Sequence, residues 1–113
     1  MATYVLLNLT ASGSKVTQRV FQEAINGCRP QADYKYRIIF ATEQDAIVAL
    51  NNAYPRDQFE NCVKANLARS GGELEPMVVV QAGDLGQFSR TVQTQILQLV
   101  QQIQNDGNTV EGF

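Results

Sequence analysis

A strand-to-helix transition late in the chain constrains the fold more than any other feature. Met77 to Val80 is a short apolar run, mostly β-branched, which is typical of a strand covered on both faces. The glycine-containing segment Ala82 to Gly86 interrupts this run, and the longest helical pattern of the chain then extends to Gln104. Its apolar residues recur at three- and four-residue spacing, at Phe88, Val92, Ile96, Leu99 and Ile103. The rest of the chain must therefore supply neighbours for this strand and helices that cover it.

Two more strands and three more helices are predicted upstream. Thr3 to Leu9 is apolar on both faces and is expected to be an interior strand, whereas Tyr34 to Ala41 alternates as a half-buried strand does. The expected helices are a first from about Val16 to Ile25, a second over Ala46 to Ala53 with Thr42 as its cap, and a third from about Arg56 to Arg69.

The predicted order is strand, helix, strand, helix, helix, strand, helix. Because at least one helix separates each strand from the next, parallel right-handed crossovers are the default. We therefore expect an α/β fold with a small three-stranded, mainly parallel sheet covered by about four helices. Residues 1–107 would form this single domain, and residues 108–113 are expected to be a flexible C-terminal tail.

The composition favours an ordinary globular chain. The net charge is −2 and the sequence pI is about 5.0, whereas nucleic-acid binding usually needs a clustered basic surface. No apolar run approaches the ~20 residues of a membrane span, and Tyr4 to Leu7 ends too soon for a secretory signal. A cytoplasmic protein is expected. Cys28 and Cys62 are therefore expected to be reduced thiols, with a disulfide between them as the alternative.

The chain contains no histidine, which bears strongly on catalysis. Histidine is the only side chain whose unperturbed pKa lies near neutrality, and nucleophile systems that use it cannot be built here. The carboxylate pairs Glu43 with Asp45 and Glu73 with Glu75 resemble helix-start and loop residues rather than a catalytic or metal site. We therefore expect no enzyme activity, no catalytic residues, no metal site and no cofactor.

Two turns that follow strands are candidate sites for a nucleotide or another phosphorylated ligand. Backbone N–H groups at a helix start, with hydroxyls and a lysine, can hold a phosphate, and in a parallel sheet both turns would lie at one edge. The residues concerned are Ser12, Gly13, Ser14, Lys15, Gly83 and Gly86. The alternative is that both are plain capped turns, because neither has the glycine pattern of a phosphate-binding loop.

A basic and aromatic segment is the only candidate for single-stranded nucleic acid. It consists of Tyr34, Lys35, Tyr36 and Arg37. Rings stack on bases and cations contact phosphates. Strand alternation, however, places the tyrosines on one face and the cations on the other, so stacking and phosphate contact would share a surface only if the strand lies at an edge. This favours an ordinary amphipathic strand and makes nucleic acid a less favoured partner.

The outer face of the last helix is unusually neutral. Seven glutamines and one charged residue lie between Gln87 and Gln104. An uncharged amide face around an outward leucine can pack against a partner without desolvating charge. The candidate interface residues are Arg90, Gln93, Leu97 and Gln101. The alternative is a neutral surface helix that carries one outward leucine.

These patterns predict a small intracellular non-enzymatic protein that acts through protein–protein contact, as an adaptor, inhibitor or assembly component. We expect it to self-associate, and we expect a charged residue in place of Leu97 to dissociate the assembly. The size would also suit a regulatory accessory protein of a phage or mobile element. The alternatives are a module for a small phosphorylated ligand and a binder of single-stranded nucleic acid.

Overall fold

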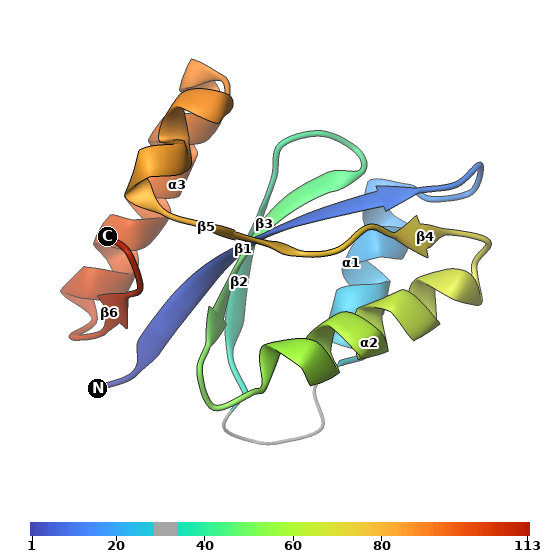
Figure 1. Cartoon of the computed structure of the whole chain (residues 1–113), viewed down its shortest axis with the longest axis horizontal. Coiled ribbons are helices and arrows are strands. Elements are labelled where there is room, and N and C mark those ends of the chain that lie inside the picture. Colours follow the sequence, from blue (N-terminus) through green and yellow to red (C-terminus); the bar gives the residue numbers. More distant parts are fainter. Residues whose placement is uncertain (29–33) are drawn as a thin grey trace.

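The computed structural model describes residues 1–28 and 34–113. Figure 1 shows its strands crossing the middle of the molecule, with α3 on one side and α1 and α2 on the other. The elements follow in the order β1 (Thr3–Ser12), α1 (Gln18–Asn26), β2 (Tyr36–Phe40), β3 (Asp45–Asn51), α2 (Arg56–Ala68), β4 (Glu73–Leu74), β5 (Val78–Val80), the 3₁₀ helix η1 (Ala82–Gln87), α3 (Arg90–Asn105) and β6 (Thr109–Val110).

β1 is the centre of a curled, six-stranded mixed sheet. One side of β1 pairs with β3, which in turn pairs with β2, and both of these pairings are antiparallel. The other side of β1 pairs with β6 in parallel and with β5 and β4 in antiparallel fashion. β1 is ten residues long, so these three short strands occupy successive stretches of one of its sides.

The expected three-stranded, mainly parallel sheet is therefore wrong. The error arises at Ala46 to Ala53, which was expected to be a helix, because the chain forms β3 there and pairs it with both β1 and β2. Residues 46–50 are 0% exposed. A strand that is buried on both faces is apolar at nearly every position, so its sequence contains the same three- and four-residue spacings as a buried helix.

The sheet separates two apolar cores. On one face the residues Val5, Leu7 and Leu9 of β1 pack with α1 and α2, which contribute Phe21 and Phe59. On the opposite face alternate residues of β1 and β3 pack with α3; the fully buried members are Leu6, Ile47, Ala49, Ile96 and Ile103. β1 is thus an interior strand, as its two apolar faces predicted, and the apolar stripe of α3 faces the sheet.

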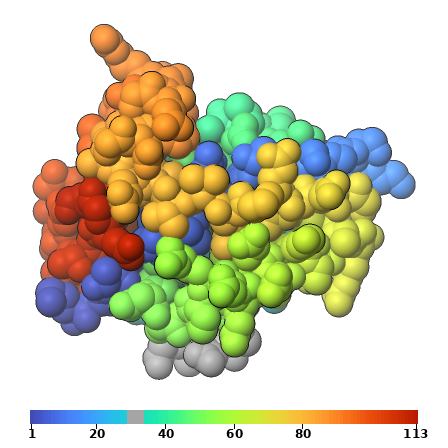
Figure 2. All heavy atoms as spheres, viewed as in Figure 1, coloured from blue at the N-terminus to red at the C-terminus, as the bar shows by residue number. Residues whose placement is uncertain are grey.

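The segment 108–113, which was expected to be a flexible tail, is attached to the start of the chain. Thr109 and Val110 form β6 in register with Thr3 and Tyr4 of β1. The N–H of Ala2 donates to the side-chain oxygen of Asn108 at 2.8 Å. Figure 2 shows the red C-terminal segment beside the blue N-terminal one. Residues 108–110 therefore belong to the sheet and its surroundings.

Cys28 and Cys62 form a disulfide, where reduced thiols were expected. Cys28 lies two residues beyond α1 and Cys62 lies within α2, and their Cα atoms are 5.9 Å apart, a separation that a disulfide spans without backbone movement. The side-chain amide of Asn66 donates to Ala24 O at 3.0 Å and lies 3.4 Å from Cys28 Sγ. The bond therefore joins the two helices that cover the same face of the sheet.

Candidate functional site

The open edge of β2 is the candidate site that the sheet topology provides. Within residues 1–28 and 34–113, β2 pairs only with β3 and ends the sheet. It is five residues long, whereas β4, β5 and β6 on the far side of β1 have only two or three residues each. Short edge strands are one way in which proteins prevent unwanted strand pairing, and β2 lacks that protection.

The register of β2 and β3 fixes which backbone groups of β2 point outward. Asn51 N–H donates to Lys35 O at 3.1 Å, and Ala41 N–H donates to Asp45 O at 2.9 Å. Bonded positions alternate along an antiparallel pair, so the odd-numbered residues of β2 face β3. The even-numbered residues therefore direct their N–H and C=O groups away from the sheet; they are Tyr36, Ile38 and Phe40.

In the part of the chain that the structure describes, two hollows border this edge. The larger one has a volume of about 630 Å³ and lies beside Tyr36 and Ile38, between α1 and the end of α3. The smaller one, of about 370 Å³, lies between Phe40 and the exposed side of α1. Gln22 of α1 lines both hollows. The side chains of all five β2 residues are partly buried, so each retains surface that another chain could cover.

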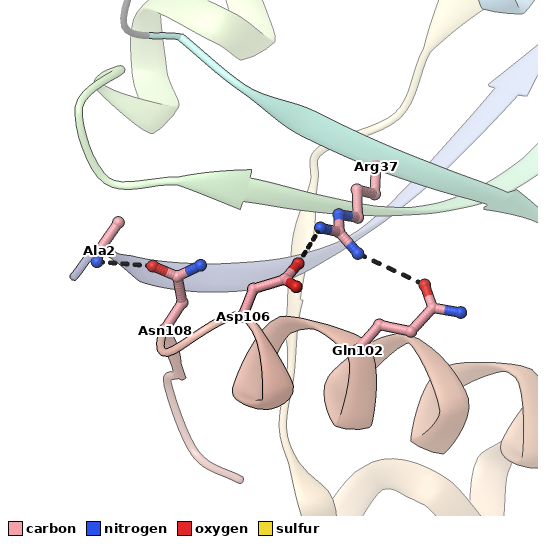
Figure 3. A network of polar contacts seen from close by, with 5 residues as sticks. All are labelled: Ala2, Arg37, Gln102, Asp106 and Asn108. Carbon is pink, nitrogen blue, oxygen red and sulfur yellow. Dashed lines mark hydrogen bonds and ion pairs between the residues drawn. The ribbon is translucent and has the colours of Figure 1, made fainter.

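Arg37 is held on the α3 side of β2 by a network that Figure 3 shows. Its guanidinium donates to a carboxylate oxygen of Asp106, at 2.6 Å, and to the side-chain oxygen of Gln102, at 3.4 Å. Gln102 lies in the last turn of α3, and Asp106 is the residue that ends the helix. The network therefore fastens the end of α3 to β2 and leaves Arg37 with an anionic partner.

Replacement of Asp106 by Asn is expected to lower the free energy of unfolding by only about 0.5 kcal/mol, because ion pairs exposed to this degree are screened by solvent. The side chains of Arg37 and Asp106 are 38% and 55% exposed. Urea unfolding of the two single variants, Arg37→Gln and Asp106→Asn, and of the double variant would give the coupling energy. A coupling above about 2 kcal/mol would contradict the solvent-screened description.

The four residues considered for nucleic-acid binding all line the larger hollow beside the β2 edge, but they differ in exposure and in their partners. Tyr34 is buried, and its ring packs against Tyr54 and Phe59 at centroid distances of 4.8 and 5.9 Å. Tyr36 is partly buried on that same side, whereas Lys35 is exposed and Arg37 is engaged with Asp106. Tyr34 is too buried to stack on a base, whereas Tyr36 keeps partial exposure at the sheet edge, so nucleic-acid binding by this segment stays a prediction.

The two glycine turns lie at different ends of the sheet. Ser12 ends β1, whereas β5, which leads into the turn with Gly83 and Gly86, pairs with Leu6 to Asn8 near the middle of β1. Because β5 is antiparallel to β1, the C-terminal end of β5 points toward the start of β1. Along β1, roughly 20 Å separate Leu6, which pairs with that end of β5, from Ser12. Figure 1 shows the two turns on opposite sides. The shared ligand edge, which required a parallel sheet, does not form.

In the turn Ser12 to Lys15, Gly13 has a structural role, and Ser12 and Gly13 line a hollow of about 380 Å³. Gly13 has φ +130° and lies against the backbone of Gly71 and Gly72. The side chains of Ser14 and Lys15 are exposed, and α1 begins later, where Thr17 Oγ1 accepts from Val20 N–H at 3.2 Å. The turn therefore lies apart from the N-terminus of the helix that would have helped to bind a phosphate.

The outward face of α3 is present but is arranged differently from the expected one. Leu97 is 50% exposed and lines a shallow hollow of about 640 Å³ together with Thr94, Gln98, Gln101 and Gln102. Arg90 is exposed at the start of the helix, whereas the amide of Gln93 turns back and donates to Phe88 O at 2.9 Å. The face thus contains one outward apolar side chain among neutral polar ones.

Metal-ligand groups and membrane-spanning helices were sought among the described residues. In the ranges 1–28 and 34–113, no group of three or more Cys, Asp or Glu residues lies close enough together to hold a metal ion. Among the described helices, none has both the length and the apolar character needed to cross a bilayer. Comparison of the chain with protein-family models, with curated proteins and with solved structures gives no match.

Ile38 and Glu43, which lie in β2 and in the turn after it, were not among the predicted site residues. Ile38 lies at the middle of the outward row, and Glu43 lies in the turn after β2, where its carboxylate accepts from Gln18 N–H at 3.1 Å. The alternation from Tyr34 to Ala41 predicted a half-buried strand but gave no information on its neighbours. Only a prediction of β3 as a strand would have identified β2 as half of a hairpin at the sheet edge.

Proposed function

We propose that this protein acts through protein–protein contact and associates with itself, as an adaptor, inhibitor or assembly component, and that it is not an enzyme. The single observation that supports the proposal is the open edge of β2. An unpaired row of N–H and C=O groups is a ready template for a further strand, and such pairing is a common mode of protein recognition.

The middle of the edge has none of the usual devices against pairing. Natural edges carry proline, a bulge or charged side chains; β2 has no proline, continues in regular register with β3, and has Arg37 as its one charged residue. Residues 38–40 are Ile, Ile and Phe. The two cations close to this edge are Lys35, just before β2, and Arg37, its second residue. Arg37 already forms an ion pair with Asp106. An added strand would cover apolar side chains and complete backbone hydrogen bonds together.

The face of α3 around Leu97 is the second surface available for contact. It offers one half-exposed leucine, whereas the β2 edge offers three partly buried side chains and the backbone groups of three residues. Main-chain hydrogen bonds supply affinity in strand addition, and a single leucine on a neutral helix supplies little. The edge is therefore the stronger candidate for self-association.

Light scattering behind a sizing column, at two protein and two salt concentrations, is expected to give a mass of twice the 12.5 kDa of one chain. Leu97→Lys is expected to leave that mass unchanged, because the edge and not α3 makes the contact. Dissociation by Leu97→Lys would instead move the contact to α3. A mass of one chain under all conditions would contradict self-association.

A further inference from the structure

We infer that a second copy of this chain adds to β2 edge to edge, antiparallel, about a two-fold axis at Ile38. The inference rests on the proposed self-association and specifies the surface and the arrangement that produce it. The two sheets would join into one continuous sheet through the strands that now end them. The pairing is isologous, since the same residues of both copies form it.

The outward backbone groups suit this register. With Ile38 opposite Ile38 of the second copy, Tyr36 lies opposite Phe40 of the second copy, and the reverse pair follows by symmetry. The members of each pair direct their N–H and C=O groups at one another, so that each pair exchanges two hydrogen bonds. The same side chains lie on one face of the sheet, where an aromatic residue would meet an aromatic residue and isoleucine would meet isoleucine.

Charge selects the antiparallel arrangement and favours a second copy as the occupant. Lys35 is exposed just before β2, and Glu43 is exposed in the turn after it, where one of its two carboxylate oxygens accepts from Gln18 N–H. Antiparallel pairing about Ile38 places Lys35 opposite Ala41 of the second copy, near the turn that contains its Glu43, and symmetry gives this contact twice. Long side chains reach such diagonal neighbours. Parallel pairing would bring lysine to lysine and glutamate to glutamate.

The surroundings of the edge fit this arrangement. The hollows beside Tyr36 and Phe40 leave room along the α1 side of the strand. Arg37 would lie opposite Ile39 of the second copy, and its guanidinium keeps Asp106 of its own chain as partner at 2.6 Å. The pairing therefore covers apolar surface without burying an unpaired cation.

Two charge reversals test the arrangement. Lys35→Glu gives a chain with acidic groups at both ends of the edge, and Glu43→Lys gives one with basic groups at both ends. Each variant alone is expected to dimerise at least tenfold more weakly than the wild type at low salt, because both contacts become repulsive. Mixed together, the two variants are expected to form a heterodimer, since both contacts are again complementary. Native mass spectrometry distinguishes the three species.

Lys64→Glu is the matched control, because Lys64 is exposed on α2 and the reversal changes the net charge as Lys35→Glu does. It is expected to dimerise as the wild type does. Ile38→Pro tests the backbone separately, because it removes an outward N–H and leaves the bonds to β3 in place. Circular dichroism should show a folded chain, and light scattering should give the mass of a single chain.

The outcomes separate this inference from the proposed function. A wild-type protein that remains a single chain overturns both. A wild-type dimer that Lys35→Glu and Glu43→Lys do not weaken, or a mixture that forms no heterodimer, overturns the pairing at β2 and leaves self-association standing. If Lys64→Glu weakened dimerisation to the same degree, the effect would be one of general charge, and the pairing at β2 would again be overturned.

Discussion

Loss of the Cys28–Cys62 disulfide is expected to lower the free energy of unfolding by roughly 3–4 kcal/mol. The bond closes a loop between residues 34 positions apart, so it restricts the unfolded chain considerably. It also fastens α1 to α2 on one face of the sheet, where Cys28 is completely buried. A domain of this size has about 5–15 kcal/mol of stability in total, so the loss would be a large part of it.

Urea unfolding with and without a thiol reductant measures this effect. The double variant Cys28→Ala with Cys62→Ala is the control, because it should be as unstable as the reduced protein and should not respond to reductant. Two free thiols in unfolded protein that was purified without reductant would show that the bond does not form. Equal midpoints for the oxidised and reduced protein would contradict its stabilising role.

Gly13→Ala is expected to lower the free energy of unfolding by about 2–4 kcal/mol, since it combines backbone strain with overpacking. Gly13 has φ +130°, a region that side chains other than glycine rarely adopt. A Cβ atom there would lie 2.6 Å from Gly71 O and 2.9 Å from Gly72 Cα. Both atoms belong to the backbone, so neither can rotate away, and the turns at the ends of β1 and α2 would have to separate.

Gly83→Ala and Gly86→Ala are the matched controls for this substitution. Both glycines lie in η1, neither has a positive φ, and nothing lies within 4 Å of a Cβ atom built on either. Their unfolding free energies are expected to change by about 0.5 kcal/mol or less. If Gly13→Ala behaved as they do, the close approach of the two turns would be contradicted.

Helical periodicity predicted the helices well, because their apolar residues face one way and their other residues face water. The expected helices at 16–25 and 56–69 correspond to α1 and α2, and the last one corresponds to α3. The same signal failed at β3, where burial on both faces removes the contrast between inside and outside. β4 and β6 have two residues each, too few to form any pattern.

The candidate site could not be predicted, because it depends on the order of the strands in the sheet. An edge is a property of strand order, and strand order followed from β3, which was expected to be a helix. Tyr34 to Arg37 was recognised as unusual, but its alternation did not show that Tyr34 joins an aromatic core while the next residues border open space. The disulfide likewise had no local signal, because only the tertiary packing of α1 on α2 brings its cysteines together.

The central position of β1 also governs the order in which the chain can acquire structure. A ribosome releases β1 first, but its first sheet partner, β3, begins at Asp45, and its last, β6, ends at Val110. Contacts between residues so distant in sequence carry a large loop-closure entropy and slow folding. Within residues 1–28 and 34–113, β2 and β3 are the one pair of strands that form a local hairpin. The nascent chain is therefore expected to keep the apolar strand β1 incompletely paired until the residues of β6 have left the ribosome, and a chaperone would protect it until then.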